Sequence, residues 1–228
     1  MESGPFGRND PDMAEAPKRG MTVPILIAAF LTLILVVVRL VGELNGWDPQ
    51  FFSPAAGGGG ALVGITWLVP VFGFWFGRRL AKNGHRPRSI AGTIGACVLG
   101  FALVAGLFYV AFATEMVAGK EDWGRKAMIA FPGAAVAGLV LAIAWGRAWL
   151  TLAIYGILAR IPVLAIQYLA FEKDWKTHFN AVGKDGPKDP ETLNRVLLYA
   201  EGLFWPFGFT VLVGGLFAAL GAATVRKG

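Results

Sequence analysis

Charged residues are scarce in this chain of 228 residues: only 16% are Asp, Glu, Lys or Arg, while 55% are hydrophobic. Soluble domains average about 25% charged residues, so this balance favours a membrane protein. The net charge of +6 does not indicate nucleic-acid binding, because the basic residues lie between apolar runs and do not form one patch. We therefore expect the lipid bilayer as a partner, and no nucleic acid.

Cysteine and histidine are almost absent, with one cysteine, Cys97, and two histidines, His85 and His178. A lone cysteine cannot form an intramolecular disulfide, and a zinc site needs three or four protein ligands. The sequence also contains no Walker loop, dinucleotide-binding fingerprint or nucleophile motif. We expect no metal and no cofactor, and the sequence leaves open whether the protein is an enzyme.

Residues 1–20 lack an apolar run and contain charges of both signs together with Pro5, Pro11 and Pro17. Such a segment buries too little apolar surface to order itself. The run that follows, 21–41, is long for a signal peptide and has no small-residue cleavage site after it. We interpret 1–20 as a flexible polar tail and 21–228 as a single transmembrane helical domain.

Long apolar runs dominate the rest of the chain. Windows of about 19 residues locate candidate spans at 21–41, 59–77, 90–114, 128–145, 148–171 and 207–225. Lipid offers no hydrogen-bond partners, and no run alternates polar with apolar residues, so all should be helices. The predicted fold is an all-α, polytopic helical membrane bundle with about six transmembrane helices. A five-span arrangement, with the fourth run re-entrant, is the alternative.

Residues 128–170 need a turn, because one helix of that length would be roughly 65 Å long, about twice the hydrocarbon thickness. The segment Gly146-Arg147-Ala148 is flanked by Trp145 and Trp149. Tryptophan prefers the membrane interface, so the sequence predicts the turn at this point.

Basic residues indicate the orientation. The loop 78–89 contains Arg78, Arg79, Lys82, Arg86 and Arg88 and no acid, whereas the loop 42–58 has acids and no base. The positive-inside rule then predicts a protein of the cell membrane or an inner membrane, with both termini on the cytoplasmic side. The loop 172–197 conflicts with this rule, because it is also rich in lysine and arginine but falls on the outer side.

A short amphipathic helix is predicted before the last span. Asp189 can cap it, Pro190 suits its first position, and Leu193 and Val196 begin an apolar face at helical spacing. Pro206 should kink the chain beyond it.

Arg160 lies near the middle of the fifth span, where a charge costs at least ~2.5–3.5 kcal/mol. Gly156, Gln167 and Tyr168 lie on its side of the helix, so we expect Arg160 to face the bundle interior. Its neighbour Pro162 should bend the helix.

Acids near the span ends are few. Glu201 is the best candidate partner for Arg160, while Arg39 can pair with Glu43 at i,i+4. We nevertheless expect Glu43, Glu115 and Glu201 to extend to the interface by snorkelling.

The segment after the fifth span places His178 four residues after Asp174, a spacing compatible with an acid–base pair or a metal. A solvated helix end is the simpler interpretation. The candidate binding residues are Arg160, Gln167, Tyr168, Glu201, Asp174 and His178.

Three function hypotheses remain. The first is an integral membrane protein without an evident catalytic site, a structural or accessory subunit anchored by Arg160 that packs against other membrane proteins or anionic lipid. The second is a small solute or anion transporter with a midplane site between the second and fifth helices, because Pro70 and Pro162 occupy matching places in two inverted halves. The third is a lipid-acting enzyme that uses Arg160 for the headgroup and His178 for proton transfer.

Overall fold

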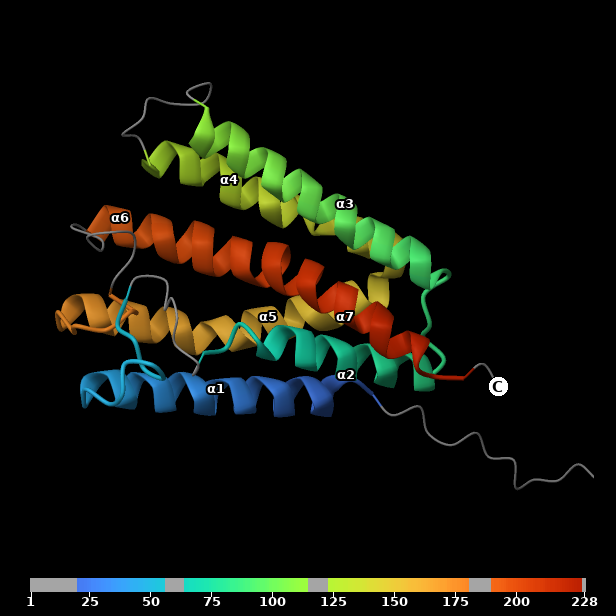
Figure 1. The fold of residues 1–228 in the computed structure, drawn as a ribbon, viewed down its shortest axis with the longest axis horizontal. Coiled ribbons are helices and arrows are strands. Elements are labelled where there is room, and N and C mark those ends of the chain that lie inside the picture. The colour runs from blue at the N-terminus through green and yellow to red at the C-terminus, as the bar shows by residue number, and fades with distance from the viewer. Residues whose placement is uncertain (1–19, 56–63, 115–122, 181–189, 227–228) are drawn as a thin grey trace, which may run out of the picture.

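The computed structural model describes residues 20–55, 64–114, 123–180 and 190–226, which form helices joined by turns, with no strand among them (Figure 1). The helices in chain order are α1 (Thr22–Leu44), α2 (Leu68–Lys82), α3 (Ile90–Phe108), η2 (Tyr109–Ala113), α4 (Trp123–Ala137), α5 (Leu139–Glu172), α6 (Pro190–Arg195), η3 (Val196–Thr210) and α7 (Val211–Ala223). The segments η2 and η3 are π-helical. The predicted all-α bundle is confirmed.

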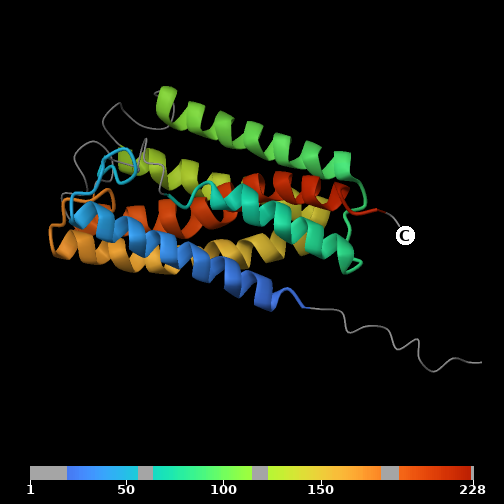
Figure 2. The same ribbon diagram turned by 60° about the horizontal axis from the view of Figure 1, so that its bottom comes forward.

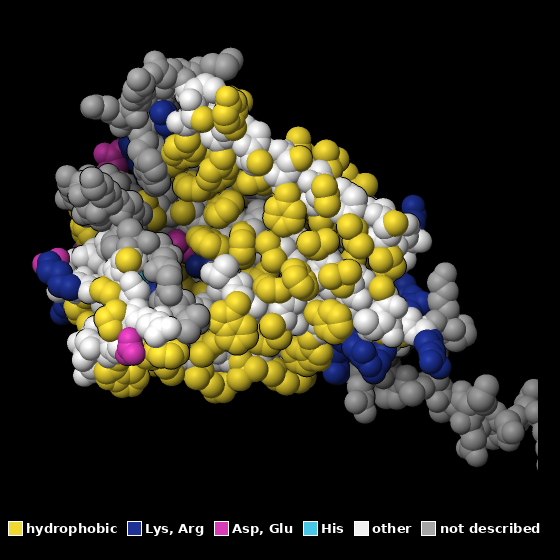
Figure 3. Space-filling view, in the orientation of Figure 1, with side chains coloured by type: hydrophobic (Ala, Val, Ile, Leu, Met, Phe, Trp, Pro, Cys, Tyr) yellow, Lys and Arg dark blue, Asp and Glu magenta, His cyan; other side chains and the backbone are white. Residues whose placement is uncertain are grey.

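Four helical runs among the described residues are long and apolar enough to cross a membrane: Thr22–Leu44, Ile90–Ala113, Leu139–Glu172 and Leu193–Ala223. Large apolar side chains such as Phe30, Val98 and Leu99 are exposed on their outer faces. Figure 3 shows one face of the molecule covered by hydrophobic side chains. Such a surface suits lipid, and the fold is a helical membrane bundle.

Successive runs alternate in direction along the bundle (Figures 1 and 2). The loop 83–89 and residues 224–226 lie at one end, which we call the basic end, and α1 ends and α6 begins at the opposite end. The six predicted spans correspond to the runs that begin with α1, α2, α3, α4, the second part of α5 and α6. Of these, α2 has 15 residues, fewer than the roughly 20 that a full span needs. The helix α4 also has 15 residues, but its run continues beyond Gly138 into the first part of α5, as far as Trp145.

The fourth and fifth runs are separated at Trp145, whose φ of −158° and ψ of 78° interrupt the helical geometry of α5. The chain reverses there, beside Gly146, as the sequence predicts (Figure 1). The indole of Trp145 donates a hydrogen bond to the carbonyl of His85 at 3.0 Å. This bond holds the reversal against the loop 83–89, so both lie at the basic end.

The second run differs from its predicted bounds of 59–77. The helix α2 begins at Leu68 and continues to Lys82, and residues 64–67 precede it as a turn, while 56–63 lie outside the described residues. Pro70 therefore lies in the first turn of α2, where a missing N–H costs little. The extension to Lys82 is favoured because Arg79 and Lys82 complement the negative end of the helix dipole.

The backbones of α2 and α7 are in direct contact. A Cβ atom on Gly73 would lie 2.5 Å from the carbonyl oxygen of Gly214, and one on Gly77 would lie 2.0 Å from that of Ala218. Only glycine fits at such distances, and the close approach yields dispersion contacts over the whole length of α2.

The run from α6 to α7 begins at Pro190, as the sequence predicts. Leu193 and Val196 on its apolar face are buried, and η3 packs against α4 and α5. In place of the predicted kink at Pro206, the chain continues as the π-helix η3. A π-helical stretch changes the hydrogen-bond register, which accommodates the missing N–H of proline.

Candidate functional site

Arg160 of α5 lies in the bundle interior, as its helix face predicts. Its Nη1 donates to Oε2 of Glu201 in η3 at 2.8 Å, and both side chains are about nine-tenths buried, at 10% exposure each. The Arg160 guanidinium also lies 4.2 Å from the centre of the Trp205 ring. Glu201 and Trp205 are four residues apart on one helix, so one segment supplies both the countercharge and the aromatic face.

Gln167 and Tyr168 have different environments. The Gln167 side chain donates to the other carboxylate oxygen of Glu201 at 3.3 Å, so Glu201 is bound from two positions on α5 that lie two helical turns apart. Tyr168 is 50% exposed on the outer surface. Of the residues predicted around Arg160, the structure therefore brings in Gln167 and Glu201 and leaves Tyr168 outside; their binding role stays a prediction.

Glycine at position 156 lets η3 approach Arg160. A Cβ there would lie 2.9 Å from the Cα and 3.0 Å from the carbonyl oxygen of Pro206. This contact, one turn before the arginine, fixes the separation of the two helices at the level of the ion pair.

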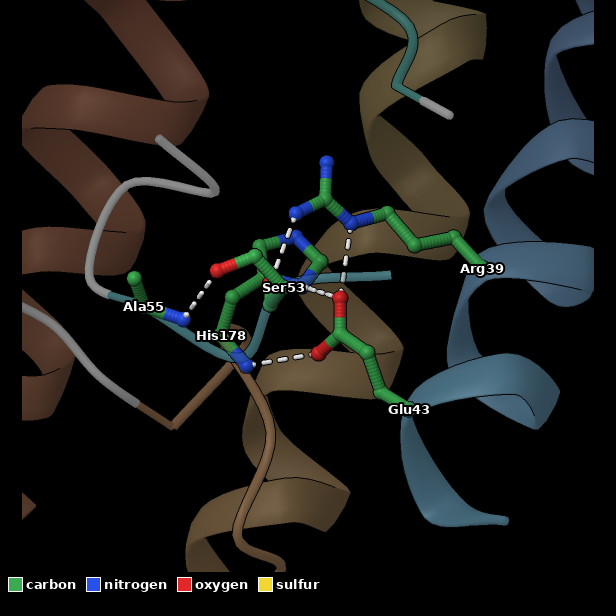
Figure 4. A network of polar contacts seen from close by, with 5 residues as sticks. All are labelled: Arg39, Glu43, Ser53, Ala55 and His178. Carbon is green, nitrogen blue, oxygen red and sulfur yellow. Dashed lines mark hydrogen bonds and ion pairs between the residues drawn. The ribbon is translucent and has the colours of Figure 1, made fainter. Parts of the chain in front are cut away.

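A second buried polar cluster is centred on Glu43, at the end of α1 (Figure 4). Arg39 donates from Nε to Oε1 of Glu43 at 2.7 Å, which confirms the predicted i,i+4 pair. Arg39 also donates from Nη2 to the carbonyl of Ser53 at 3.1 Å. The Glu43 side chain has no exposed surface, so this ion pair is buried. From the sequence we instead expected Glu43 to extend to the membrane interface.

His178 closes over the same carboxylate. Its backbone N–H donates to Oε2 of Glu43 at 2.7 Å, and its Nδ1 lies 2.6 Å from Oε1 (Figure 4). A carboxylate only accepts hydrogen bonds, so Nδ1 carries the proton and the neutral ring has its lone pair on Nε2. Burial lowers the pKa of His178 below its ordinary value, and the hydrogen bond and charge of Glu43 offset only part of this effect.

Asp174 is not the partner that the spacing to His178 predicts. Its carboxylate accepts from Lys176 at 2.7 Å, and both side chains are largely exposed. The chain turns at Asp174, which has a φ of 48°, so the segment leaves the helix and the i,i+4 geometry is lost.

The expected snorkelling of the acids is wrong for Glu43 and Glu201, which are each only 8% exposed, while Glu115 lies outside the described residues. Snorkelling is favoured where a side chain has no partner in the protein. Here each carboxylate has an arginine and a further donor from this chain, so the interior is the better environment.

Two further contacts were not anticipated from the sequence. The contact of Trp205 with Arg160 could have been inferred from the sequence, because Trp205 lies one turn after Glu201 on the same helix face. The approach of His178 to Glu43, across 135 residues, had none.

Within the described residues, no group of three His, Cys, Asp or Glu side chains is placed to hold a metal ion. The two clusters provide buried, hydrogen-bonded charges of both signs. No protein-family model, curated protein sequence or solved structure matches this chain.

Proposed function

We propose that this protein is a structural or accessory subunit of the cell or inner membrane, with the Arg160–Glu201 pair as its interior anchor. The observation that carries the proposal is that the intramembrane arginine takes its countercharge from the same chain, at 2.8 Å. The guanidinium charge is thereby matched within the protein. The ion pair between Arg160 and Glu201 therefore holds α5 against η3.

The alternatives have less support. A transporter with a midplane site was inferred from prolines that interrupt matching helices, but Pro70 lies in the first turn of α2. An enzyme that binds an anionic headgroup at Arg160 would have to displace Glu201 from it. Breaking a buried ion pair costs about 3–5 kcal/mol, so substrate would have to supply that energy.

The proposed orientation has both termini in the cytoplasm. It is supported by the position of residues 20–21, of the loop 83–89 and of residues 224–226 at the basic end (Figures 1 and 2). Arg78 hydrogen-bonds to Thr224 at 3.2 Å, which ties the last helix to the same end.

A double-mutant cycle tests the anchor. Arg160→Met and Glu201→Gln should each lower the unfolding free energy by about 3–5 kcal/mol, because each leaves one buried charge unpaired. The double variant should recover most of the loss, since no lone charge remains. The thermal unfolding midpoint in detergent and the yield in the membrane fraction measure this. Lys176→Met, in the exposed pair with Asp174, is the control and should change little.

The anchor proposal fails if Arg160→Met keeps wild-type stability but no longer binds an anionic lipid or solute that the wild type binds. The subunit proposal is tested separately by cross-linking in native membranes. A larger complex supports it, and migration as a monomer under the same conditions contradicts it.

Orientation is tested by labelling in intact cells with a membrane-impermeant maleimide. In a Cys97→Ala background, Gln50→Cys at the opposite end should be labelled and Lys82→Cys at the basic end should not. The reverse pattern would overturn the proposed orientation.

A further inference from the structure

One end of the bundle holds basic residues without acids. Among the described residues, the basic end contains Arg78, Arg79, Lys82, Arg86, Arg88, Arg147 and Arg226. The described acids lie elsewhere, toward the opposite end: Glu43, Asp48, Glu172, Asp174, Glu191 and Glu201. On the face drawn in Figure 3, Lys and Arg side chains gather at the basic end without acids, while the acids lie at the opposite end, where Lys and Arg are also present. The positive charge of this end is therefore not balanced by described acids.

An open cavity of about 490 Å³ lies at this end, between the loop 83–89 and the end of α7. Its polar lining comes from Arg86, Arg88 and Ser89. Its apolar lining comes from Ile90 at the start of α3 and from Ala222 and Val225 at the end of α7. The cavity thus joins a cationic rim to the apolar surface of two helices.

Arg86 fixes the shape of the cavity. Its Nη2 donates to the carbonyl oxygens of Ala222 and Val225, which lie where α7 ends. The carbonyl of Ala222 also accepts from the backbone N–H of Val225 at 3.2 Å, in the turn that ends α7. Arg86 adds a charged donor to this turn and holds the loop against α7. Its guanidinium is therefore held at the wall of the cavity.

The arginines, and not the helix end, carry the charge of this cavity. Ser89 accepts a hydrogen bond from the backbone N–H of Gly92 at 3.0 Å, so it already caps α3. Arg88 is exposed, and neither Arg86 nor Arg88 forms an ion pair within the described part of the chain. Arg88 is free to bind an anion that enters.

We propose that this cavity binds a phosphate group, held by Arg88 with the charge of Arg86 beside it. A guanidinium presents paired N–H donors that match phosphate oxygens. Ile90 and Val225 form the apolar part of the wall. Ile90 is also the first residue of α3, which exposes side chains such as Val98 further along, so acyl chains of a lipid bound here can lie against this helix. Basic pockets between helices at the cytoplasmic side are suited to phospholipid headgroups. The phosphate comes either from an anionic phospholipid or from free phosphate.

The site differs from Arg160, which the sequence suggested as an anion site. Arg160 has Glu201 at 2.8 Å, whereas the cavity arginines have no such acid among the described residues. A ligand at the basic end therefore does not have to break an ion pair. The site also does not depend on the anchor, so failure of one proposal leaves the other intact.

The experiment compares wild type, Arg88→Gln and Lys82→Gln. Lys82→Gln removes one charge from the same end at a position that does not line the cavity, so it reports the effect of general charge. Each protein is placed in nanodiscs of phosphatidylcholine, alone or mixed with phosphatidylglycerol, and bound lipid is counted by native mass spectrometry. A second arm adds inorganic phosphate in detergent and follows the unfolding midpoint.

We expect the wild type to retain phosphatidylglycerol in preference to phosphatidylcholine. Arg88→Gln should weaken that binding roughly tenfold or more, the usual effect of losing a hydrogen bond to a charged group. Lys82→Gln should weaken it much less, and Arg88→Lys should retain part of it. Stabilisation by inorganic phosphate would identify free phosphate as a ligand, and its absence would leave the lipid as the source.

Two results would overturn the proposal. The first is equal retention of the two lipids by the wild type together with no response to phosphate. The second is an equal loss of phosphatidylglycerol in Arg88→Gln and Lys82→Gln, which would mean that the end attracts anions only through its overall charge.

Discussion

Gly156 of α5 lies against Pro206 of η3 so closely that a Cβ at 156 would be 2.9 Å from the proline Cα. We predict that Gly156→Ala destabilises the protein by about 1–3 kcal/mol. The new methyl group would meet backbone atoms of Pro206, which cannot move aside as the end of a flexible side chain can. Gly95→Ala on α3 is the matched control. Its Cβ would meet nothing within 4 Å, so the better helix propensity of alanine should leave stability equal or higher. Thermal unfolding in detergent distinguishes the two.

The hydrogen bond between Thr32 of α1 and Tyr155 of α5 predicts an asymmetric pair of effects. Thr32 donates to the carbonyl of Ala28 at 2.8 Å, so the Tyr155 hydroxyl is the donor to Thr32 at 3.0 Å. Tyr155→Phe leaves Thr32 with a partner and should cost about 1 kcal/mol. Thr32→Val leaves a buried hydroxyl unpaired and should cost more, about 1–3 kcal/mol. Equal losses in the two variants would contradict this donor assignment.

The carboxylate of Glu43 is predicted to be required for folding. Glu43→Gln leaves the Arg39 charge unmatched and presents an N–H where His178 needs an acceptor. The expected loss is about 3–5 kcal/mol in unfolding free energy, measured by thermal melts. Asp174→Asn is the matched control, because Asp174 is exposed and has a positive φ that asparagine tolerates. A comparable loss in both variants would count against the role of the Glu43 cluster.

Stability should fall as the solution becomes acidic. The pKa of His178 is lowered in the fold, so at neutral pH the ring is neutral in both folded and unfolded chains and contributes no pH dependence. Below about pH 6.5 the unfolded ring takes up a proton first, and stability is lost as the pH falls from there toward the folded pKa. Glu43 and Arg39 of α1 and Glu201 of η3 act on this ring.

The unfolding midpoint of wild type and His178→Gln, followed from pH 7.5 to 5.5, measures this effect. We expect a steeper decline in the wild type than in the variant. If the wild type became more stable than the variant on acidification, His178 would be charged in the fold, and the assignment of a neutral ring with a lowered pKa would be wrong.

Local features of the sequence were enough to predict the fold class, an all-α membrane bundle. The apolar runs predict the helices, and the tryptophans beside Gly146 predict the reversal at Trp145. The start of α6 at Pro190 follows from helix-start preferences. The bounds of α2 were wrong because hydropathy treats Arg79 and Lys82 as loop residues, although the helix dipole favours them in a last turn.

The candidate site was predictable only in part. The inward direction of Arg160 follows from the small and polar residues on its side of the helix, and Glu201 was the best of few acids. The exposure of Tyr168 was missed, because the position of η3 around α5 decides which residues near the edge of a helix face are covered.

The sequence by itself determined that this chain forms apolar helices and where charges interrupt them, because hydropathy and helix preferences act over neighbouring residues. Only the tertiary structure decided which of the candidate charge pairs are buried and which distant groups complete them. The partners of Glu201 and Glu43 lie 41 and 135 residues away along the chain, at Arg160 and His178. Such pairs depend on how the helices pack, and a carboxylate that snorkels in isolation is buried once packing supplies its donors.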